Sequence, residues 1–498
     1  MYRRCTPGQL AFENFYLPFS GKLSGENRWV KLAALIPWEQ FEAEYAGQLS
    51  ESLGAPAKSF RMALGALIIK ERLGTSDAET VEQIRENPYL QYFLGLSEYS
   101  DRAPFDSSML VHFRKRLTLE LVGRVNEAVV LNPDETGQAQ AQIDADEPAQ
   151  EDDDDAAPPP NQGQLIIDAS CAPADIRYPT DLSLLNEARE GTEAVIDGLY
   201  EQVRAVVQPK PRTYRKQARR EYLNVTKQRK VRHKTMRKAI RKQLSYVKRN
   251  LAHIDALIAA GATLSALDKH LYRKLLVIAE LYRQQQAMYD QRQHRIDDRI
   301  VSLSQPHVRP IVRGKAGTPV EFGAKFSASC VNGHVFLDHL SWDSFNESID
   351  LPAQIELFKQ RFGHYPESVH ADQIYRSRPN QTYCRKRGIR LTGKPLGRPK
   401  AQNEAENRQQ VLADATLRNQ IEGKFGVGKR RFSLGRVMAK LAPTAECTIA
   451  ITFLVMNLER LLQLLLFVFF AVVVFLKDAF APHCSRQQPR RGQLAIAQ

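Results

Sequence analysis

The spacing of apolar residues divides the chain into helical and extended segments. Over residues 1–131 apolar side chains recur every three or four positions, as in AKSFRMALGALIIKERLG and AETVEQIRENPYLQYFLGL, with turn residues between these runs. This spacing is typical of amphipathic helices that bury one face. We therefore expect residues 1–131 to form an all-helical N-terminal domain.

Cations gather near the end of this predicted domain. In FDSSMLVHFRKRLTLELVGRVN, candidate cap residues at 106–108 precede a helix that carries Arg114, Lys115 and Arg116. A basic helix can contact the phosphates of nucleic acid, so we assign these three residues, and the domain, to DNA binding. A solvated helix face explains the same charges equally well.

Residues 132–163 have a different composition. The segment NPDETGQAQAQIDADEPAQEDDDDAAPPPNQG combines acids with Gln, Ala and Pro and has almost no large apolar residue. Such a segment cannot bury enough surface to offset the entropy that ordering costs. We expect a disordered acidic and proline-rich linker, in which the run Asp152–Asp155 is solvated charge rather than a metal site.

Two extended segments after the linker each end in an acid. The apolar run QLIID predicts a strand that ends at Asp168, and ESVHAD predicts another that ends at Asp372. Between them, residues 320–342 predict a β-hairpin around an Asn-Gly dipeptide. The later segment NRQQVLADATLRNQIEGKFG predicts a helix that carries Glu422.

A strongly basic segment interrupts these elements. Residues 210–249 contain seventeen Lys or Arg residues and one acid, Glu221, and helical spacing continues to about residue 300. We expect a basic helical insertion at about 190–305, within a domain that spans 164–460. So many like charges repel one another unless a polyanion or counterions neutralise them, which favours a clamp on nucleic-acid phosphate. A solvated coiled coil is the alternative.

The last segment, 461–498, begins with an apolar run. The sequence LLQLLLFVFFAVVVFL at 461–476 includes Gln463. It is also shorter than the ~20 residues that a helix needs to span a bilayer. We expect a helix that is buried in the protein or covered by a partner, followed by a disordered basic tail, and no membrane partner.

Composition narrows the classes of function. The chain has 498 residues, of which 43% are hydrophobic and 25% charged, as in a multidomain globular protein. Its net charge of +14 favours a polyanionic partner, nucleic acid first and an anionic membrane surface second. The six cysteines form no CxxC pair, which argues against a zinc site and a disulfide framework. The N-terminus lacks the apolar run of a secretory signal, so we expect a cytoplasmic protein.

The three acids Asp168, Asp372 and Glu422 can converge on one point. Adjacent strands lie ~5 Å apart, and a helix can pack over them. Mg²⁺ takes oxygen ligands and bridges to phosphate, so three converging acids in a basic protein suit metal-dependent phosphoryl transfer. Taken singly, each acid has a simpler explanation. Either aspartate could cap a turn or helix, and Glu422 could pair with Arg418 on a helix surface.

The order of elements is informative as a whole. Strand-Asp, hairpin, helix, strand-Asp and helix-Glu resembles the RNase H-like core of the DDE transposases of bacterial insertion sequences, and the likeness spans most of the chain. The stretch RNQIEGKFGVGKRRF is similar to the Tyr-Arg-Glu-Lys signature of one large group of these enzymes. Arg418, Glu422 and Lys429 fit the spacing of that signature.

Two features depart from the signature. Ala415 takes the position of the Tyr, so the contact made by that ring is absent or comes from elsewhere, with Phe425 and Tyr375 as candidates. Three glycines also follow Glu422, and each disfavours helix by up to ~1 kcal/mol relative to Ala. They either end the helix before Lys429 or let the backbone approach a phosphate.

The resemblance implies a fold and a chemistry. The expected fold is α/β, an RNase H-like mixed sheet flanked by helices, with the helical N-terminal domain and the basic insertion added. The acids Asp168, Asp372 and Glu422 are expected to be both catalytic and metal-binding, with two Mg²⁺ ions for which Mn²⁺ can substitute. Water would cut DNA at the element end, and the freed 3′-hydroxyl would attack target DNA, without a covalent protein intermediate.

The expected partner is double-stranded DNA, both element ends and target, bound by a homodimer in a synaptic complex on the nucleoid. The DNA-binding residues that we assign are Arg114, Lys115, Arg116, Arg398, Arg418, Lys429, Arg430 and Arg431. His370, two residues before Asp372, is either an auxiliary or a structural residue. Two other functions stay open: a transposase-derived DNA-binding protein without catalysis, and a membrane-surface protein that uses the apolar run and the basic insertion.

Overall fold

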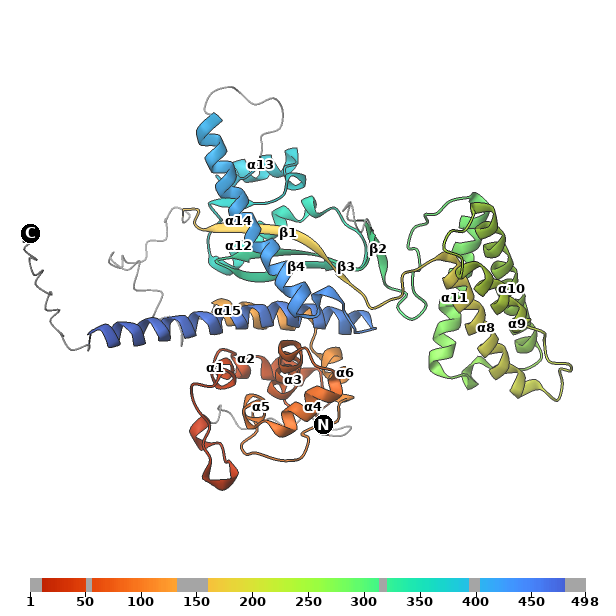
Figure 1. Ribbon diagram of the computed structural model, residues 1–498, viewed down its shortest axis with the longest axis horizontal. Coiled ribbons are helices and arrows are strands. Elements are labelled where there is room, and N and C mark those ends of the chain that lie inside the picture. The colour runs from red at the N-terminus through yellow and green to blue at the C-terminus, as the bar shows by residue number, and fades with distance from the viewer. Residues whose placement is uncertain (1–10, 51–55, 132–159, 313–319, 394–403, 480–498) are drawn as a thin grey trace, which may run out of the picture.

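The computed structural model describes residues 11–50, 56–131, 160–312, 320–393 and 404–479, without the side chains of 19, 404–408 and 468–479 (Figure 1). Most of the predicted linker, the predicted basic tail and Arg398 therefore lie outside the described residues.

Helices make up the described part of the chain before residue 132. They are η1 Phe12–Asn14, η2 Pro18–Ser20, α1 Arg28–Ala34, α2 Trp38–Gly47, α3 Phe60–Leu73, α4 Asp77–Glu86, α5 Pro88–Phe93, α6 Met109–Arg116 and α7 Leu119–Leu131. The side chains of Ser59, Ser76 and Asn87 accept hydrogen bonds from the first turns of α3, α4 and α5, as helix caps do. The predicted apolar spacing is thus realised in helices, with α3 at the centre of their shared core.

A mixed sheet of six strands follows in the described chain. The strands are β1 Gln164–Pro173, β2 Arg309–Val312, β3 Val320–Val331, β4 His334–Ser341, β5 Ser368–His370 and β6 Arg390–Leu391. The order is β2-β3-β1-β5-β6, and β4 also pairs with β3. Pairs among β1 to β4 are antiparallel, whereas β1–β5 and β5–β6 are parallel. The fold is therefore α/β with a mixed sheet, as predicted.

The predicted hairpin is present, but the first strand is longer than predicted. Asn332 and Gly333 have φ of 50° and 79°, as a two-residue turn between β3 and β4 requires. The prediction that the first strand ends at Asp168 is wrong, because β1 continues to Pro173 and pairs with β3 along its length. Asp168 is followed by the small residues ASCA, which lack the large apolar side chains that mark a strand in sequence yet pair well with β3.

The two faces of β1 pack against different helices. Leu165 and Ile167 belong to the core that includes Phe358 of α12 Leu351–Phe362. Ile166 belongs to the other core, with Ile421 of α14 Glu404–Arg431. Because successive side chains of a strand alternate, Asp168 lies on the face that α14 covers. The remaining short elements on this part of the chain are η5 Glu347–Ile349, η6 Gln373–Tyr375, α13 Arg378–Lys386 and η7 Ser433–Gly435.

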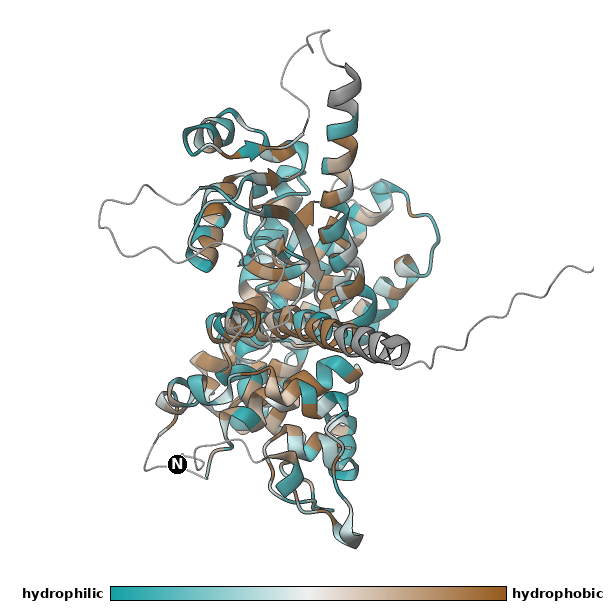
Figure 2. Ribbon diagram, turned by 90° about the vertical axis from the view of Figure 1, so that its left-hand side faces the viewer, coloured by the Kyte–Doolittle hydropathy of each residue, from teal (hydrophilic) through white to brown (hydrophobic). Residues whose placement is uncertain are grey.

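The long helix α15, Ala442–Ala479, lies between the N-terminal helices and the sheet (Figures 1 and 2). Asn457 donates through Nδ2 to Asn126 Oδ1 of α7 at 2.9 Å and to the Val335 carbonyl of β4 at 2.8 Å. The predicted boundary between residues 460 and 461 falls inside this helix, so the division into domains stays a prediction.

Part of α15 is apolar enough to cross a membrane. In the described chain, Ala442–Phe467 is the one helix that meets this test of length and composition, and most of its apolar window is buried inside the protein. Leu458 and Leu462 are buried, whereas Phe467 is exposed. This burial is typical of the core helix of a soluble protein.

The basic segment forms a bundle beside the sheet (Figure 1). Its helices are α8 Asp181–Val203, α9 Arg215–Thr226, α10 His233–Ala259, η4 Leu264–Ala266 and α11 Lys269–Gln291. The helical part begins at Asp181, about nine residues earlier than predicted, because Thr180 and Ser183 form a capping box there. We call these helices the bundle.

Candidate active site

Three acids reach one region from three elements. Asp168 lies on β1, Asp372 lies two residues after β5, and Glu422 lies on α14. The strands β1 and β5 are parallel neighbours with Ile166 opposite His370, so the same register, continued by two residues, places Asp168 level with Asp372. The helix α14 packs against both strands. Strand pairing and helix packing thus bring together the acids that the sequence separates.

Asp168 is the most perturbed of the three acids. The pKa of Asp168 is raised to about 6, mainly by burial, and the nearby charges of Asp372, Glu347 and Glu422 contribute to this rise. A hydrogen bond from the Ala169 amide to Asp168 Oδ1, at 2.8 Å, acts in the opposite direction. A carboxyl group that resists ionisation beside other carboxylates is typical of a site where a cation completes the charge balance.

Arg418 links the other two acids. Its Nη1 forms a short ion pair with Asp372 Oδ1, and its Nη2 donates to Glu422 Oε1 at 3.1 Å. The spacing of four residues places Arg418 one turn before Glu422 on the same face of α14. The predicted contact between these two helix residues is present, and the contact with Asp372 adds a partner that the helix pattern alone does not predict.

The donor set fits magnesium. Within the described part of the chain, no three His, Cys, Asp or Glu side chains form a group that could hold a metal ion. The guanidinium of Arg418 bonds to Asp372 and Glu422 and supplies positive charge there. Carboxylate oxygens are nevertheless the ligands that Mg²⁺ and Mn²⁺ prefer. In this structure Arg418, rather than a metal ion, bridges Asp372 and Glu422.

Two further residues near Asp168, Glu347 and Lys325, were not assigned roles from the sequence. The charges of Glu347 and Asp168 both raise the pKa of Tyr375, after the larger effect of burial. Lys325 neutralises Glu347 at 3.0 Å and also donates to the Phe345 carbonyl at 2.8 Å. The loop before α12 and the middle of β3 thus add a carboxylate and a cation near the acids. Their only sequence signal is polarity in an otherwise apolar hairpin and loop.

The aromatic residue beside the acids is Tyr375, not Phe425. Tyr375 is fully buried and lies three residues after Asp372, at the end of η6. Phe425 packs instead in the core, with its ring 5.4 Å from that of Phe326. Of the two candidates for the contact that Ala415 cannot make, Tyr375 is therefore the one next to the site.

His370 has a structural position. It is fully buried, its Nε2 lies 3.0 Å from Ser368 Oγ, and its Nδ1 lies 3.6 Å from Asp414 of α14. Burial lowers the pKa of His370, and the charge of Asp414 partly offsets this lowering. It therefore anchors α14 on β5 rather than facing the acids as an auxiliary.

The helix α14 persists through the three glycines. It runs to Arg431, so Lys429, Arg430 and Arg431 form its last turn. A Cβ at Gly428 would lie 3.4 Å from Met456 Sδ, so the small residue suits the close packing of α14 against α15. The predicted same-face relation of Glu422 and Lys429 thus holds.

The predicted DNA-binding residues differ in their surroundings. Arg430 is exposed, and Arg431 is exposed but paired with Glu459 at 2.9 Å. Lys429 is half-buried. On α6, Lys115 is exposed, whereas Arg114 is buried and bonds to Asp77, with Nη1 3.1 Å from Oδ2. The guanidinium of Arg114 thus joins α6 to α4 and is not presented to DNA. The local sequence did not predict this, because Asp77 lies 37 residues away.

Arg116 also turns toward the protein. Its guanidinium lies beside the hydroxyl of Tyr45, where it partly offsets the rise in pKa that burial gives that tyrosine. The side chain is half-buried. Of the three cations assigned on α6, Lys115 alone is exposed.

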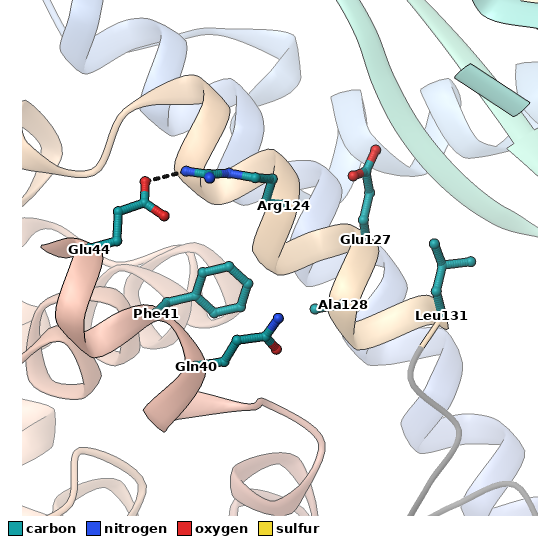
Figure 3. A pocket seen from close by; sticks show the side chains of 7 residues that line it. All are labelled: Gln40, Phe41, Glu44, Arg124, Glu127, Ala128 and Leu131. Atoms are coloured by element: carbon teal, nitrogen blue, oxygen red, sulfur yellow. Dashed lines mark hydrogen bonds and ion pairs between the residues drawn. The ribbon is translucent and has the colours of Figure 1, made fainter. Parts of the chain in front are cut away.

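Two cavities accompany these elements. One of about 410 Å³ lies between α2 and α7, where Arg124 pairs with Glu44 beside Phe41 (Figure 3). The other, of about 1100 Å³, lies along α14 and α15. Neither is lined by the three acids, but the second is lined by four cations: Lys424, Arg430, Arg431 and Arg460. A basic hollow therefore runs beside the helix that carries Glu422.

Comparison with known proteins identifies two regions of the chain. Residues 369–459 match the family model described as a transposase DDE domain, and residues 18–116 match a second model, transposase domain DUF772. The first match contains Asp372 and Glu422, whereas Asp168 precedes it. No solved structure matches the chain.

A curated protein is also similar to part of the chain. The uncharacterized protein ORF8 in the nfe locus of Rhizobium meliloti is 30% identical over 159 residues, which cover 32% of this chain and 68% of the relative. The two transposase matches lie on either side of the sheet's first strands and include the second and third acids of the site. The chain belongs to the DDE transposases of bacterial insertion sequences.

Proposed function

We propose that this transposase cuts DNA at the ends of an insertion sequence and joins the freed 3′ ends to target DNA, with Asp168, Asp372 and Glu422 as its catalytic and metal-binding residues. Two Mg²⁺ ions, or Mn²⁺ in their place, would activate the attacking oxygen and stabilise the leaving one. The observation that carries the proposal is the meeting of these acids, seen in the raised pKa of Asp168 and the bonds of Arg418.

The topology supports an RNase H-like core. Strands β4, β3 and β1 are antiparallel neighbours, and β5 and β6 continue from β1 in parallel. This arrangement of a three-stranded meander followed by two parallel strands is the expected sheet of that fold. The first acid on the central strand, the second after its parallel neighbour and the third on a covering helix fit the same scheme.

The residues around the acids have separable roles. Burial at β1 keeps Asp168 fixed and partly dry, which strengthens its interaction with any bound charge. Arg418 holds Asp372 and Glu422 at one point and can turn to a DNA phosphate when those acids take a cation. Arg430 and Arg431, at the end of α14, lie where the backbone of the same DNA would continue. Lys115 and Lys429 complete the cations that we assign to DNA.

No side chain is assigned as a nucleophile. Water would attack the phosphodiester at the element end, and the resulting 3′-hydroxyl would attack the target strand. Bringing two ends together requires two active sites, so a homodimer on double-stranded DNA in the nucleoid is the expected working form. The retention of all three acids favours this enzyme over a DNA-binding protein that has lost catalysis.

The test is cleavage of DNA that carries the inverted repeats flanking the coding region. Wild-type protein with Mg²⁺ should nick these ends and leave 3′-hydroxyl groups, and EDTA should abolish the reaction. Asp168→Ala, Asp372→Ala and Glu422→Ala should each abolish cleavage while binding of the same DNA persists. Asp343→Ala, which removes an exposed carboxylate in the loop after β4, is the control and should keep activity. Unchanged cleavage by the Asp372→Ala variant would show that the site is assigned wrongly.

A further inference from the structure

We propose that the bundle is a second DNA-binding surface, in which one face of α10 and the adjoining α9 hold the phosphate backbone of duplex DNA. This inference rests on the proposed function for DNA as the polyanion. It adds a binding surface outside the catalytic sheet and outside the residues assigned above.

The cations of α10 form one stripe. Lys234, Lys238, Arg241 and Lys248 are spaced by four, three and seven residues, and Ser245 occupies the intervening position. This spacing places them on one face of the helix. All are exposed. At 1.5 Å per residue the stripe is about 21 Å long, enough to follow several phosphates of a duplex. We call these four residues the α10 stripe.

The stripe is not needed to hold the bundle together. The opposite face of α10 carries Val247, with Ile254 further along, and both are buried in cores shared with α8 and α11. The helix is amphipathic, with its apolar side satisfied inside the bundle. The charged face is therefore free to serve a partner.

More exposed cations adjoin the stripe. They lie on α9 and on the connection between α9 and α10: Lys216, Arg219, Arg220, Lys227, Arg229, Lys230 and Arg232. Glu221, the one acid of this region, already accepts from Lys242 at 2.7 Å and Tyr246 at 3.1 Å. Asp197 of α8 likewise forms ion pairs with Lys210 and Arg215.

Glu221 and Asp197, the acids near these cations, therefore already have other partners. Within the part of the chain that the structure describes, neither the α10 stripe nor the seven exposed cations from Lys216 to Arg232 form an ion pair with an acid, whereas Lys210, Arg215 and Lys242 do. So many like charges on one surface repel one another, and a polyanion that releases its counterions relieves this repulsion. Duplex DNA, with a charge every ~1.7 Å along its axis, has the matching density.

The composition of the stripe distinguishes DNA from a membrane. A helix that lies on an anionic bilayer presents large apolar side chains beside its cations. The position between Arg241 and Lys248 on this face is Ser245, and the apolar side of α10 is buried in the bundle. The surface is therefore suited to phosphates at a polar backbone rather than to insertion among lipids.

The position of the bundle also suits a long duplex. It is joined to the sheet through the segments after β1 and before β2, and it stands beside the sheet beyond β2 (Figure 1). The bundle therefore extends the molecule beyond the β2 edge of the sheet (Figure 1).

The test compares two variants of the full-length protein that lose equal charge. The stripe variant is Lys234→Gln, Lys238→Gln, Arg241→Gln and Lys248→Gln, and Gln is a good helix former at exposed positions. The control variant changes four exposed cations at the end of α8 and on α11: Arg204→Gln, Lys269→Gln, Arg273→Gln and Arg283→Gln. Binding of a random-sequence duplex of roughly four helical turns is measured with EDTA across a salt titration from about 50 to 200 mM.

The wild-type protein should bind with a steep salt dependence. For each phosphate contact removed, the slope of log affinity against log salt should become shallower by about 0.9. The slope of the stripe variant should therefore be shallower than that of wild type by about 2 or more, and the slope of the control variant should change clearly less. Equal slopes for the two variants would overturn the inference. If wild-type protein binds no duplex, the proposed function fails as well, so the two failures are distinguishable.

A second measurement needs no substitution. Acetylation of lysines in the wild-type protein, read by mass spectrometry, should be slowed by duplex DNA at Lys234, Lys238 and Lys248 but not at Lys269. Equal protection at all four, or protection of the stripe by anionic phosphatidylserine vesicles and not by DNA, would contradict the proposal.

Discussion

Arg418 on α14 forms an ion pair with Asp372, which follows β5 and lies 46 residues earlier in the chain. The same guanidinium bonds to Glu422 at 3.1 Å, so one cation joins two of the three acids. The positive charge that these acids require is thus supplied by the protein itself in this structure.

This relationship predicts a competition between Arg418 and metal. Arg418→Ala removes a positive charge beside two proposed ligands, so Mn²⁺ should bind the DNA-free protein more tightly, by roughly tenfold or about 1.4 kcal/mol. Calorimetric titration measures the affinity directly. DNA cleavage by the same variant should fall, because the contact that orients both acids is lost.

Arg283→Ala is the control for this change, because Arg283 also pairs with a helix carboxylate, Glu280, but lies in the bundle. It should leave Mn²⁺ affinity unchanged. Weaker Mn²⁺ binding by Arg418→Ala would mean that Arg418 arranges the ligands for metal rather than competing with it.

A second prediction concerns the pH dependence of stability. The pKa of Asp168 is raised to about 6, so its carboxyl group holds a proton more tightly in the folded than in the unfolded chain. The free energy of unfolding therefore gains from this group at low pH and loses that gain as pH rises from about 4 to about 6. Asp168→Asn lacks the ionisation and should be more stable than wild type by roughly 1–3 kcal/mol at about pH 8, without metal.

Thermal melts of the metal-free proteins at about pH 4 and pH 8 measure this difference. The advantage of Asp168→Asn should nearly vanish at the lower pH and should also be reduced by Mg²⁺, which stabilises wild type alone. The exposed Asp298→Asn is the control. An advantage of the same size at both pH values would show that ionisation of Asp168 is not its cause.

A third prediction concerns the junction between the N-terminal helices and the end of α14. Glu71 of α3 is buried and accepts hydrogen bonds from the Ser433 amide at 2.8 Å, the Ser433 hydroxyl at 2.6 Å and the Thr452 hydroxyl at 2.5 Å. Glu71→Ala removes the acceptor of all three bonds, and Thr452 keeps only its bond to the Thr448 carbonyl at 3.1 Å, so the change should cost roughly 2–4 kcal/mol of stability. Thr452→Val removes one donor and should cost less.

The same junction fixes the turn that follows Arg431. Denaturant unfolding compares the two variants, and limited proteolysis near residue 433 reports local loosening. Equal small losses for both variants would show that the Glu71 contacts contribute little. A loss confined to Glu71→Ala would fit an acid that docks the basic end of α14 onto the N-terminal helices.

A fourth prediction uses two glycines with opposite surroundings. A Cβ at Gly323 would lie 2.1 Å from the Ala172 carbonyl oxygen, so Gly323→Ala must push β3 away from β1. It should destabilise the protein by about 1–3 kcal/mol or more. Gly423 lies in α14 with nothing within 4 Å of its Cβ position, so Gly423→Ala should stabilise the helix by up to ~1 kcal/mol. Melting temperatures of the two variants should move in opposite directions, and a shared direction would contradict the packing described here.

The sequence predicts the elements of the site better than it predicts their contacts. Short apolar runs locate the strands around Asp168 and Asp372, and the four-residue spacing predicts the bond between Arg418 and Glu422. The glycines of α14 left its extent open, because helix propensity is a local quantity. In the structure Gly428 packs against Met456 of α15, and the sequence near Gly428 does not predict this contact between distant residues.

Contacts between distant segments lie beyond such patterns. The partner of Arg114 is Asp77, 37 residues away, so a basic run alone could not show that this arginine is buried. Glu347 and Lys325 reach the acids only through the fold of the hairpin and the loop before α12. Short edge strands such as β6 have too few residues to show a periodicity.

The central claim is that Asp372 holds a divalent metal during DNA cleavage. The most direct test is the Asp372→Cys variant, assayed on element-end DNA with Mg²⁺ and with Mn²⁺, because thiolate binds Mg²⁺ poorly and accepts softer ions better. We expect no cleavage with Mg²⁺ and recovery of cleavage with Mn²⁺. Cleavage at the wild-type rate with Mg²⁺ would show that Asp372 does not hold the metal.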